Sequence, residues 1–369
     1  MSALLIGVLC LFVAQRFAFI LASLLPPRVF EGHGDTPSVT VIVAAFNEEG
    51  SLPVLLAHLG RLDYPPEKLA FVLASDGSTD RTSALMSSWC VGRERSSCLV
   101  LPRRMGKAAA LQLAWEQGAD TDLIAVYDAD AAPRPDCLGI LAREFADRRL
   151  GAASGSCRPV GRVPGVVARY AALELWVYQM VNLSGRDRLG LSPPVVGANA
   201  VYRAAALREI GGFPREAVSE DVEVSFALVN HGWKTRFLPE AVAETAVCGT
   251  LAGFWAQRLR WTRGLHQARR HARSLQSLSV LTGYLDRLVF LGAILAAWLG
   301  RISWLWPALY VSGPVLAIWV ALRRVGQSRK AVFILGSVPM FLVDLAATAA
   351  ATLASLGRMR PQWSPRRQG

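Results

Sequence analysis

A run of apolar residues that ends at two aspartates constrains this chain more than any other feature. Residues 123–127 read Leu-Ile-Ala-Val-Tyr, and Asp128 and Asp130 follow. Such a run is typical of a parallel strand buried on both faces. Side chains two residues apart point the same way, so the two carboxylates can bind one Mg²⁺ or Mn²⁺ together. Alternatively, the pair caps a helix that follows Pro133, and the motif alone leaves both interpretations open.

Other strand ends favour a binding site. Apolar runs at Ser38–Ala45, Leu69–Ser75 and residues 99–101 are each followed by a helical pattern. Strands that alternate with helices predict an α/β fold with a doubly wound, mostly parallel sheet. Such sheets bind ligands beyond the carboxyl ends of their strands. Five polar residues fall at these ends: Asn47, Glu48, Asp76, Asp128 and Asp130.

Two common nucleotide-binding loops are absent from the sequence. Neither GxGxxG nor GxxxxGK[ST] occurs, which argues against a dinucleotide enzyme and a P-loop NTPase. A sheet that binds a nucleotide without a glycine-rich loop needs another ligand for the phosphates. A metal ion on Asp128 and Asp130 would supply it.

Apolar segments at both ends predict a membrane protein. The chain is 52% hydrophobic, and the surplus lies outside the middle of the sequence. Leu4–Leu25 is long enough to span a bilayer, although Arg16 interrupts it and is expected to face other helices or a polar cavity. Three further apolar segments follow the middle region, at Leu288–Gly300, Ile302–Leu322 and Ala331–Leu356. We therefore count four spans and expect a multi-pass integral membrane protein.

These observations divide the chain into five parts. We expect an N-terminal transmembrane anchor at residues 1–27, a globular α/β domain at 28–250, an amphipathic interface region at 251–284, C-terminal transmembrane helices at 285–358 and a basic tail at 359–369.

The net charge of +12 reflects basic residues that flank the predicted membrane segments rather than a nucleic-acid-binding surface. Many of the basic residues flank the apolar ends, where they favour the cytoplasmic side. The middle region has no basic stripe interleaved with aromatic residues, so no nucleic-acid partner is expected. The basic loop at 323–330 should be cytoplasmic, but four spans would then place residues 358–367 outside. Either one segment is only interfacial, or the charge rule fails here.

Two later motifs carry polar groups at the start of helices. Ser219, Glu220 and Asp221 open a helix that runs to about Asn230. Acidic residues there favour the helix dipole, but they also suit a proton acceptor aimed into a cleft.

A basic and aromatic helix precedes the C-terminal membrane segments. Residues 254–263 read FWAQRLRWTR, which places Gln257 and Trp261 on one helix face with Arg260 beside them. An interfacial amphipathic helix and a phosphate-binding or stacking role are equally open.

Taken together, these motifs resemble the inverting family 2 glycosyltransferases of the GT-A fold, in the membrane-bound branch of cellulose, chitin and hyaluronan synthases and ceramide glucosyltransferase. Over Ser38–Gly264 the chain has VIVAAFNEE, SDGSTDRT, GKAAAL, DAD, GANAVYR, GGFP, SED and QRLRW in the family's order. Each motif alone is weak, and their order makes the match specific. Two positions depart from the family pattern: Ser75, where the family often has Asp, and Ser219, where it often has Thr.

The resemblance implies roles for individual residues. Asp221 would be the general base on the acceptor hydroxyl. Asp128 and Asp130 would form the DxD metal site, with Asp130 the direct ligand. The donor-binding residues would be Asn47, Glu48, Asp76, Lys107, Asp128, Gln257 and Arg260, with Asp76 reading the base and Arg260 holding the diphosphate. Glu220 and Trp261 would contact the acceptor. All four aspartates must then converge on one cleft.

The implied activity is transfer of a sugar from a nucleotide-sugar donor, with a UDP-sugar expected first, to a membrane-embedded lipid or glycan. A divalent Mg²⁺ or Mn²⁺ would be the cofactor. A processive polysaccharide synthase is the nearest alternative. A metal-dependent nucleotidyltransferase is the alternative from another class, although the glycine-rich signature such enzymes carry is absent from FNEEGS. The intact acidic and QRLRW motifs argue against a catalytically inactive membrane scaffold.

Overall fold

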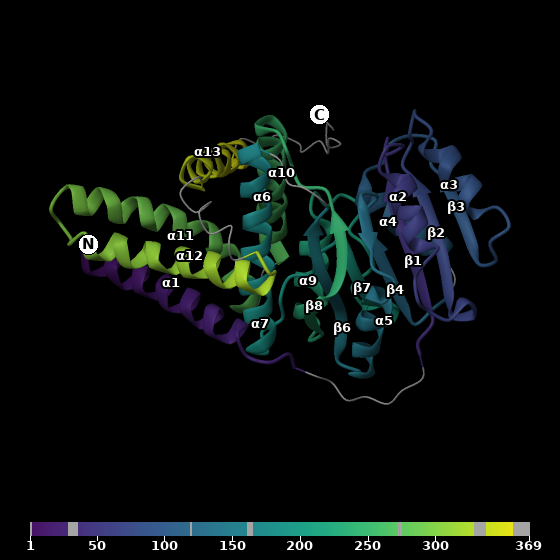
Figure 1. Ribbon diagram of the computed structural model, residues 1–369, viewed down its shortest axis with the longest axis horizontal. Coiled ribbons are helices and arrows are strands. Elements are labelled where there is room, and N and C mark those ends of the chain that lie inside the picture. Colours follow the sequence, from purple (N-terminus) through teal and green to yellow (C-terminus); the bar gives the residue numbers. More distant parts are fainter. Residues whose placement is uncertain are drawn as a thin grey trace.

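The computed structural model combines a mixed α/β domain with a bundle of long helices that extends from one side of it (Figure 1). It describes residues 2–28, 36–118, 120–160, 165–271, 273, 275–327 and 337–356. The tail expected at 359–369 and the segment 328–336 lie outside the described residues.

The domain is built on one twisted sheet. In the described chain its strand order is β3-β2-β1-β4-β7-β6-β8-β5, and β1, β2, β3 and β4 run parallel. β7 is antiparallel to both β4 and β6, whereas β6 and β8 are parallel. The strands are β1 (Val39–Ala45), β2 (Leu69–Ser75), β3 (Ser96–Val100), β4 (Leu123–Tyr127), β5 (Ala131–Pro133), β6 (Leu150–Pro159), β7 (Asn199–Arg203) and β8 (Lys234–Thr245).

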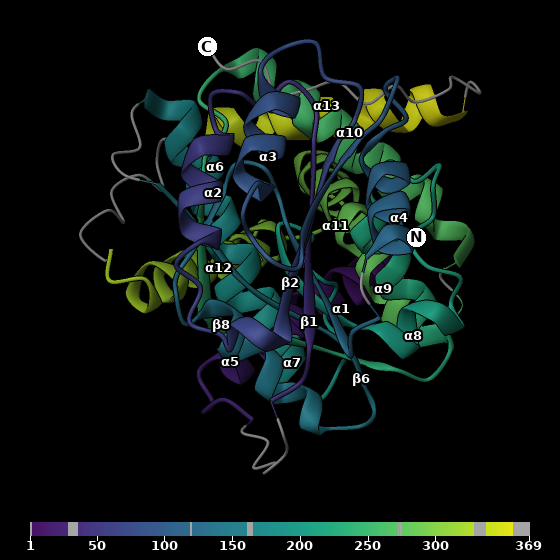
Figure 2. The same cartoon turned by 90° about the vertical axis from the view of Figure 1, so that its right-hand side faces the viewer.

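Helices cover both faces of this sheet, as the end-on view shows (Figure 2). In β1, Val41 and Val43 pack on one side and Ile42 on the other, which explains why the whole strand is apolar. The first core contains α2 (Leu52–Leu59), α3 (Thr82–Cys90) and α5 (Cys137–Arg143). The second contains α4 (Lys107–Gln117), α8 (Ala204–Glu209) and α9 (Glu220–Asn230). Single 3-10 turns lie at Pro66–Lys68, Glu144–Ala146 and Arg269–His271.

The predicted doubly wound, mostly parallel sheet is confirmed for β1 to β4, but its second half differs. Only Asn199–Arg203 of the apolar run at 194–203 is a strand. Residues 194–198 form a loop, and Pro194 at its start cannot donate a ladder hydrogen bond. The long strand β8 was not expected, because Pro239 interrupts its sequence pattern.

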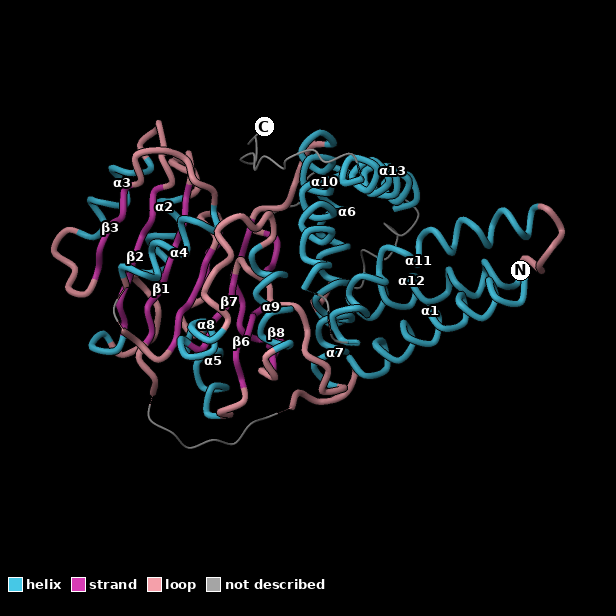
Figure 3. The backbone as a smooth tube through the Cα atoms, turned by 180° about the vertical axis from the view of Figure 1, so that it is seen from behind, coloured by secondary structure: helices cyan, strands magenta, loops and turns pink. Residues whose placement is uncertain are grey.

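The remaining helices join the domain to the bundle. α1 (Ser2–Ser23), α11 (Leu275–Trp298) and α12 (Leu305–Arg324) lie side by side and form the bundle (Figures 1 and 3). Between bundle and sheet stand α6 (Gly165–Val177), which continues as a π-helix (Tyr178–Leu183) into α7 (Ser184–Arg188), and α10 (Leu251–Ala268). The two perpendicular views show that α13 (Ser337–Leu356) lies across the direction of the bundle (Figures 1 and 2).

The structure supports fewer membrane spans than the four expected. Among the described residues, α1 and α12 are long and apolar enough to cross a bilayer, and α13 has a shorter apolar stretch at Pro339–Leu353. Arg16 of α1 faces other helices, as its mid-helix position predicts. It pairs with Asp286 of α11 and lies 4.7 Å from the ring centroid of Tyr310 in α12.

The close pairing of β6 with β8 yields a stability prediction. The β6–β8 register shifts after Gly155, and a Cβ atom there would overlap the carbonyl oxygen of Ala241. We expect Gly155→Val to destabilise the protein by about 3 kcal/mol, as overpacking of a core does.

Thermal unfolding of the detergent-purified full chain measures this effect. Gly139→Ala is the matched control, because the nearest atom to its new Cβ is the Asp63 carbonyl oxygen at 3.8 Å. An unchanged melting temperature for Gly155→Val would contradict the described packing.

Candidate active site

The polar residues predicted at strand ends lie along one edge of the sheet. Asn47 and Glu48 follow β1, Asp76 follows β2, and Asp128 follows β4. These three strands are adjacent and parallel, so their carboxyl ends share that edge. The fold therefore places residues that are distant in sequence within one region.

Lys107, the first residue of α4, connects two parts of this region. Its Nζ lies 2.6 Å from Asp128 Oδ1 and 2.6 Å from Glu220 Oε1. Burial disfavours the ammonium ion, but the carboxylates of Asp128 and Glu220 outweigh that effect and raise the pKa of Lys107 well above its usual range. Lys107 is therefore a permanent positive charge between the DxD motif and α9.

Asp221 is held at the start of α9 by two backbone donors. Gly197 N–H donates to its Oδ2 over 3.2 Å, and Val222 N–H donates to its Oδ1 over 2.9 Å. A Cβ atom on Gly197 would lie 2.9 Å from that same oxygen, so only glycine permits this approach. Burial and the neighbouring Glu220 carboxylate raise the pKa of Asp221 to about 6. A carboxyl group with such a pKa suits proton transfer near neutral pH.

The DxD pair presents hard oxygen ligands. Asp130 Oδ2 accepts a hydrogen bond from the Thr245 hydroxyl, at 3.3 Å, at the end of β8. Among the described residues no group of three or more His, Cys, Asp or Glu side chains forms a metal cage. Two carboxylates suffice for an ion that completes its shell with water and phosphate oxygens. Since Lys107 contacts Asp128, the pair fits a cation held mainly by Asp130.

Asp76 is enclosed by the segment that leads into α4. Its side chain is 2% exposed, and it accepts hydrogen bonds from the backbone N–H groups of Met105 and Gly106, at 2.6 and 2.8 Å. Asp76 thus fixes the residues that directly precede Lys107. Its predicted role in reading a nucleotide base stays a prediction.

Asn47 and Glu48 join the loops after β1 and β2. Asn47 has a positive φ of 53°, and its Oδ1 accepts a hydrogen bond from Thr79 N–H at 2.8 Å. Glu48 N–H donates to the Thr82 hydroxyl at 2.8 Å. Arg104 lies 4.2 Å from the ring centroid of Phe46, beside the same loops. These contacts shape the wall of the region predicted to bind the donor.

Helix α10 carries the QRLRW motif and borders the start of α9. Gln257 and Arg260 are half-buried, and Trp261 is 39% exposed. Further along the helix, the Gln267 side chain accepts a hydrogen bond from Val218 N–H at 3.0 Å and donates to the Glu216 carbonyl oxygen at 3.0 Å.

A close helix–loop contact lies between these groups. A Cβ atom on Gly264 would overlap the Ser219 hydroxyl, so α10 touches the loop that precedes Glu220 and Asp221.

The structure brings most of the predicted residues together. One charged group contains Asp128, Lys107, Glu220 and Asp221. All four charges interact electrostatically with the hydroxyl of the buried Tyr202. Asp130 lies two residues after Asp128 in the sequence. Asp76 is linked to Lys107 through its hydrogen bonds with the N–H groups of Met105 and Gly106. The position of Gln257, Arg260 and Trp261 is set by helix α10. Gly264 and Gln267 of that helix contact the loop that precedes Glu220. Gly197 was expected to allow a close backbone approach, but its contact with Asp221 was not predicted, and neither were Thr245 and Gln267, because sequence spacing gives no signal for a partner so distant along the chain.

Comparison with known proteins agrees with this geometry. A family model described as "Glycosyl transferase family group 2" matches residues 123–348, more than half of the chain. A second, "Glycosyltransferase family 25, N-terminal domain", matches residues 36–100. The chain is 27% identical over 242 residues to the probable glycosyltransferase YdaM of Bacillus subtilis, covering 64% of this chain and 57% of that protein.

The chain is also 30% identical over 269 residues to an N-acetylglucosaminyltransferase of Rhizobium leguminosarum bv. viciae, covering 70% of this chain and 61% of the relative. It therefore spans less than two thirds of the length of these curated relatives. Among solved structures, the mannosyltransferase PcManGT from Pyrobaculum calidifontis, in complex with GDP-Man and Mn2+, has a TM-score of 0.63 at 22% identity. That match covers 95% of this chain and 99% of the other, and it confirms the predicted fold class.

The bridging lysine gives a prediction that does not depend on activity. Lys107→Met would leave the carboxylates of Asp128, Glu220 and Asp221 together without their cation. We expect a loss of about 2 kcal/mol in unfolding free energy at pH 7, below the roughly 3–5 kcal/mol of a fully buried pair because the site is partly open to solvent.

Unfolding at two pH values tests the cause. Without Lys107 the pKa of Asp221 rises, so the folded variant binds a proton that the unfolded chain releases, and the loss shrinks near pH 5. Lys68→Met is the control, since Lys68 lies at the surface and donates a hydrogen bond to the Thr36 carbonyl oxygen at 2.6 Å. A pH-independent loss would contradict the electrostatic explanation.

Proposed function

We propose, on the premise that this chain belongs to the family 2 glycosyltransferases, that it transfers a sugar from a nucleotide-sugar donor to an acceptor held at a membrane. One observation carries the proposal. Asp221, with its pKa raised to about 6, lies in the same charged group as Asp128 of the DxD motif. A proton acceptor beside a phosphate-binding edge is what a single-displacement glycosyl transfer needs.

Asp221 acts as the general base in this proposal. It accepts the proton of the acceptor hydroxyl as that oxygen attacks the anomeric carbon of the donor. The backbone N–H groups of Gly197 and Val222 fix the orientation of its carboxylate. One displacement from the face opposite the leaving group inverts the configuration, so an α-linked donor gives a β-linked product.

The donor binds along the carboxyl ends of β1, β2 and β4. Asp76 would read the base, and Asn47 and Glu48 line the first loop. Lys107 and Arg260 are the cations that would face the diphosphate. Gln257 belongs to the same motif as Arg260. Asp128 and Asp130 would hold the divalent metal, which when bound supplies electrostatic stabilisation of the leaving diphosphate.

The relatives suggest which donor to try first. Two bear on the choice: one is named an N-acetylglucosaminyltransferase, and the structural neighbour was solved with GDP-Man and Mn2+. We propose UDP-N-acetylglucosamine as the first candidate, with GDP-mannose as the second. A growing glycan chain in place of a lipid acceptor is the processive form of the same reaction.

The bundle supports a membrane-held acceptor. Several large apolar side chains on its outer surface are exposed, which is unusual unless lipid or protein covers them. They include Leu4, Leu11 and Leu21 of α1, Leu288 and Leu295 of α11, and Leu305 and Trp319 of α12. We propose that the bundle inserts into the bilayer with the catalytic domain on the cytoplasmic side, where nucleotide sugars are found. Glu220 and Trp261 would then contact the acceptor.

A donor panel tests the proposed function. Membranes that contain the full chain are incubated with UDP- and GDP-sugars and Mg²⁺ or Mn²⁺, and released nucleoside diphosphate is measured. Release of diphosphate with a labelled glycolipid supports single transfer, and a ladder of products supports the processive form. Release of pyrophosphate instead would indicate a nucleotidyltransferase, and no release from any donor would overturn the proposal.

The general base gives the first kinetic prediction. We expect Asp221→Asn to lower kcat by roughly 10²–10⁴-fold, the usual contribution of base catalysis. Donor affinity should change little, because Asn keeps the shape of the carboxylate. A kcat within threefold of the wild-type value would exclude Asp221 as the base.

Stability provides the control for this variant. The folded pKa of Asp221 is raised above its unfolded value, so the folded state prefers the protonated carboxyl, and this contribution is lost as the pH rises through about 6. Asp221→Asn removes this unfavourable buried charge but also one acceptor of a backbone N–H group, so its melting temperature should stay close to that of the wild type at pH 7. A lower melting temperature would mean that lost activity reflects unfolding.

The neighbouring carboxylate gives a pH prediction. Activity of the wild type should rise with pH and reach half its plateau near the Asp221 pKa of about 6. Glu220→Gln removes a negative charge that raises this pKa, so the rising limb should shift to lower pH. The pH profile of kcat/KM measures the shift, and Glu209→Gln, at the surface of the domain, is the control. A shift to higher pH would contradict the assigned coupling.

A further inference from the structure

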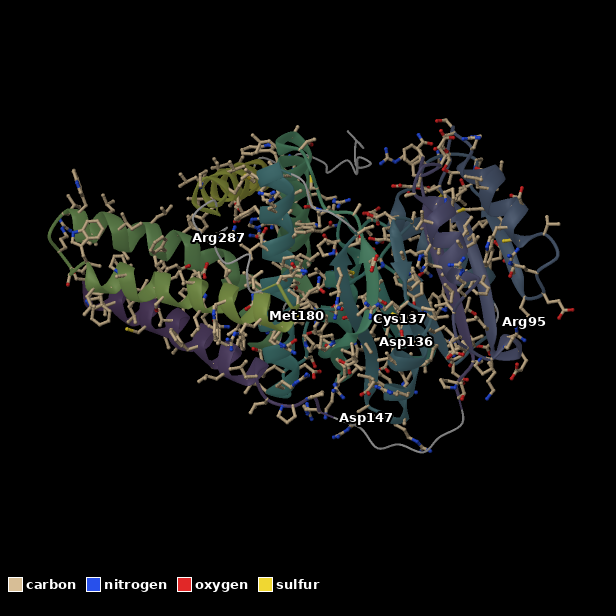
Figure 4. The ribbon with its side chains drawn as sticks, in the orientation of Figure 1. Arg95, Asp136, Cys137, Asp147, Met180 and Arg287 are labelled. Carbon is tan, nitrogen blue, oxygen red and sulfur yellow. The ribbon has the colours of Figure 1, made fainter. Side chains whose placement is uncertain are left out.

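A buried cluster of four charged residues lies where α6, α10, α11 and α13 meet. It contains Glu174, Arg258, Arg287 and Asp344, one from each helix, and we call it the four-charge cluster. Asp344 is 0% exposed and Arg258 is 8% exposed. Figure 4 shows Arg287 at this junction, on the bundle side of the domain, and none of the four residues belongs to the strand ends that carry the predicted donor-binding residues. The cluster is therefore separate from the site described above.

The contacts of the cluster form a closed ring. Arg258 Nη2 pairs with Glu174 Oε2, and Arg258 Nε lies 3.4 Å from Asp344 Oδ1. Arg287 Nη1 pairs with the other oxygen of Asp344, and its Nη2 lies 3.8 Å from Glu174 Oε1. Two positive and two negative groups alternate, so the ring is neutral. Each arginine touches both acids, and each acid touches both arginines.

Such a ring stabilises a protein less than its contacts suggest. Removing four charges from water is costly, and well-packed apolar side chains at such sites are often equally stable or more so. Charge pairs are instead sensitive to relative position, because their energy falls when the helices slide past one another. A ring that joins four helices therefore favours one arrangement of those helices.

The ring fixes the position of α10 in particular, because Arg258 belongs to that helix. Arg258 lies between Gln257 and the Arg260–Trp261 pair of the QRLRW motif. Its guanidinium group lies 4.7 Å from the ring centroid of Trp261 and 4.6 Å from that of Phe254. The residue that anchors α10 in the cluster therefore also supports the indole predicted to contact the acceptor.

The same helix reaches the proposed base at its other end. Gln267 binds Val218 N–H and the Glu216 carbonyl oxygen, and Gly264 touches Ser219. α10 thus runs without a break from the four-charge cluster to the loop that precedes Asp221.

We propose that Arg258 is a positioning residue, and that the four-charge cluster holds α10 in the one placement that sets both the QRLRW side chains and the loop of the base. Asp344, on α13, is the essential partner in this role. The C-terminal helix then takes part in assembling the active site, although it contributes no catalytic residue. This inference rests on the proposed function, because it assumes the roles of Trp261 and Asp221 in transfer.

Variants of the ring test the proposal in membranes that contain the full chain. Asp344→Asn keeps the side-chain shape but removes its charge. We expect kcat for transfer to fall by about 10- to 100-fold, as small misplacements of catalytic groups do. The donor KM should rise by less than kcat falls, because Lys107 and Asp128 lie on other elements and only Gln257 and Arg260 of the proposed donor site move with α10. Asp344→Glu keeps the charge and should retain most of the activity.

Two further variants keep the test decisive. Arg258→Lys preserves the charge but not the planar fork that reaches both acids, so it should lower kcat even if Asp344→Asn fails to fold. Asp286→Asn is the matched control: it lies next to Arg287 on α11 and breaks a bundle ion pair with Arg16. It should lower the melting temperature and leave kcat within about twofold.

The outcomes separate this proposal from the proposed function. Wild-type kcat in both Asp344→Asn and Arg258→Lys would overturn the positioning role, as would an equal loss of kcat in Asp286→Asn. A donor KM that rises in step with the loss of kcat would also overturn it. If the wild type itself releases no nucleoside diphosphate, the proposed function has failed instead.

Discussion

The candidate site depends on one ammonium group placed among carboxylates. Asp128, Glu220 and Asp221 come from two elements that are about ninety residues apart, and like charges at such distances repel strongly in a partly buried site. Lys107 contacts two of them and lowers the pKa of the third. Its own position follows from Asp76, which fixes the start of α4 through the Met105 and Gly106 N–H groups. These carboxylates can therefore lie close together because Asp76, at the end of β2, fixes the position of the Lys107 ammonium group.

The first half of the sheet was predictable because its strands are apolar on both faces. β1, β2 and β4 are continuous apolar runs that end in polar residues, and this pattern fixes both the strand and the edge that carries the ligands. The second half was not predictable in the same way. Pro194 and Pro239 break the local patterns around β7 and β8, and tertiary pairing decides where those strands begin.

The residue types of the site could be read from the sequence, but their partners could not. Asp128, Asp130 and Asp221 stand out by motif, whereas Gly197, Thr245 and Gln267 matter only through contacts across the fold. The same limit explains the membrane segments. Hydropathy treats α13 as a span, but Asp344 on that helix faces two arginines, and the helix lies across the bundle (Figure 2). Hydropathy alone does not register that this helix pairs its charge with other helices.

The contact between Gly264 and Ser219 has a mechanical consequence. With no side chain between them, helix and loop behave as one stiff body, because nothing compressible separates their atoms. A displacement of α10 would therefore move this loop as well. A shift of the helix that carries the QRLRW motif is thus passed directly to the segment that precedes Asp221.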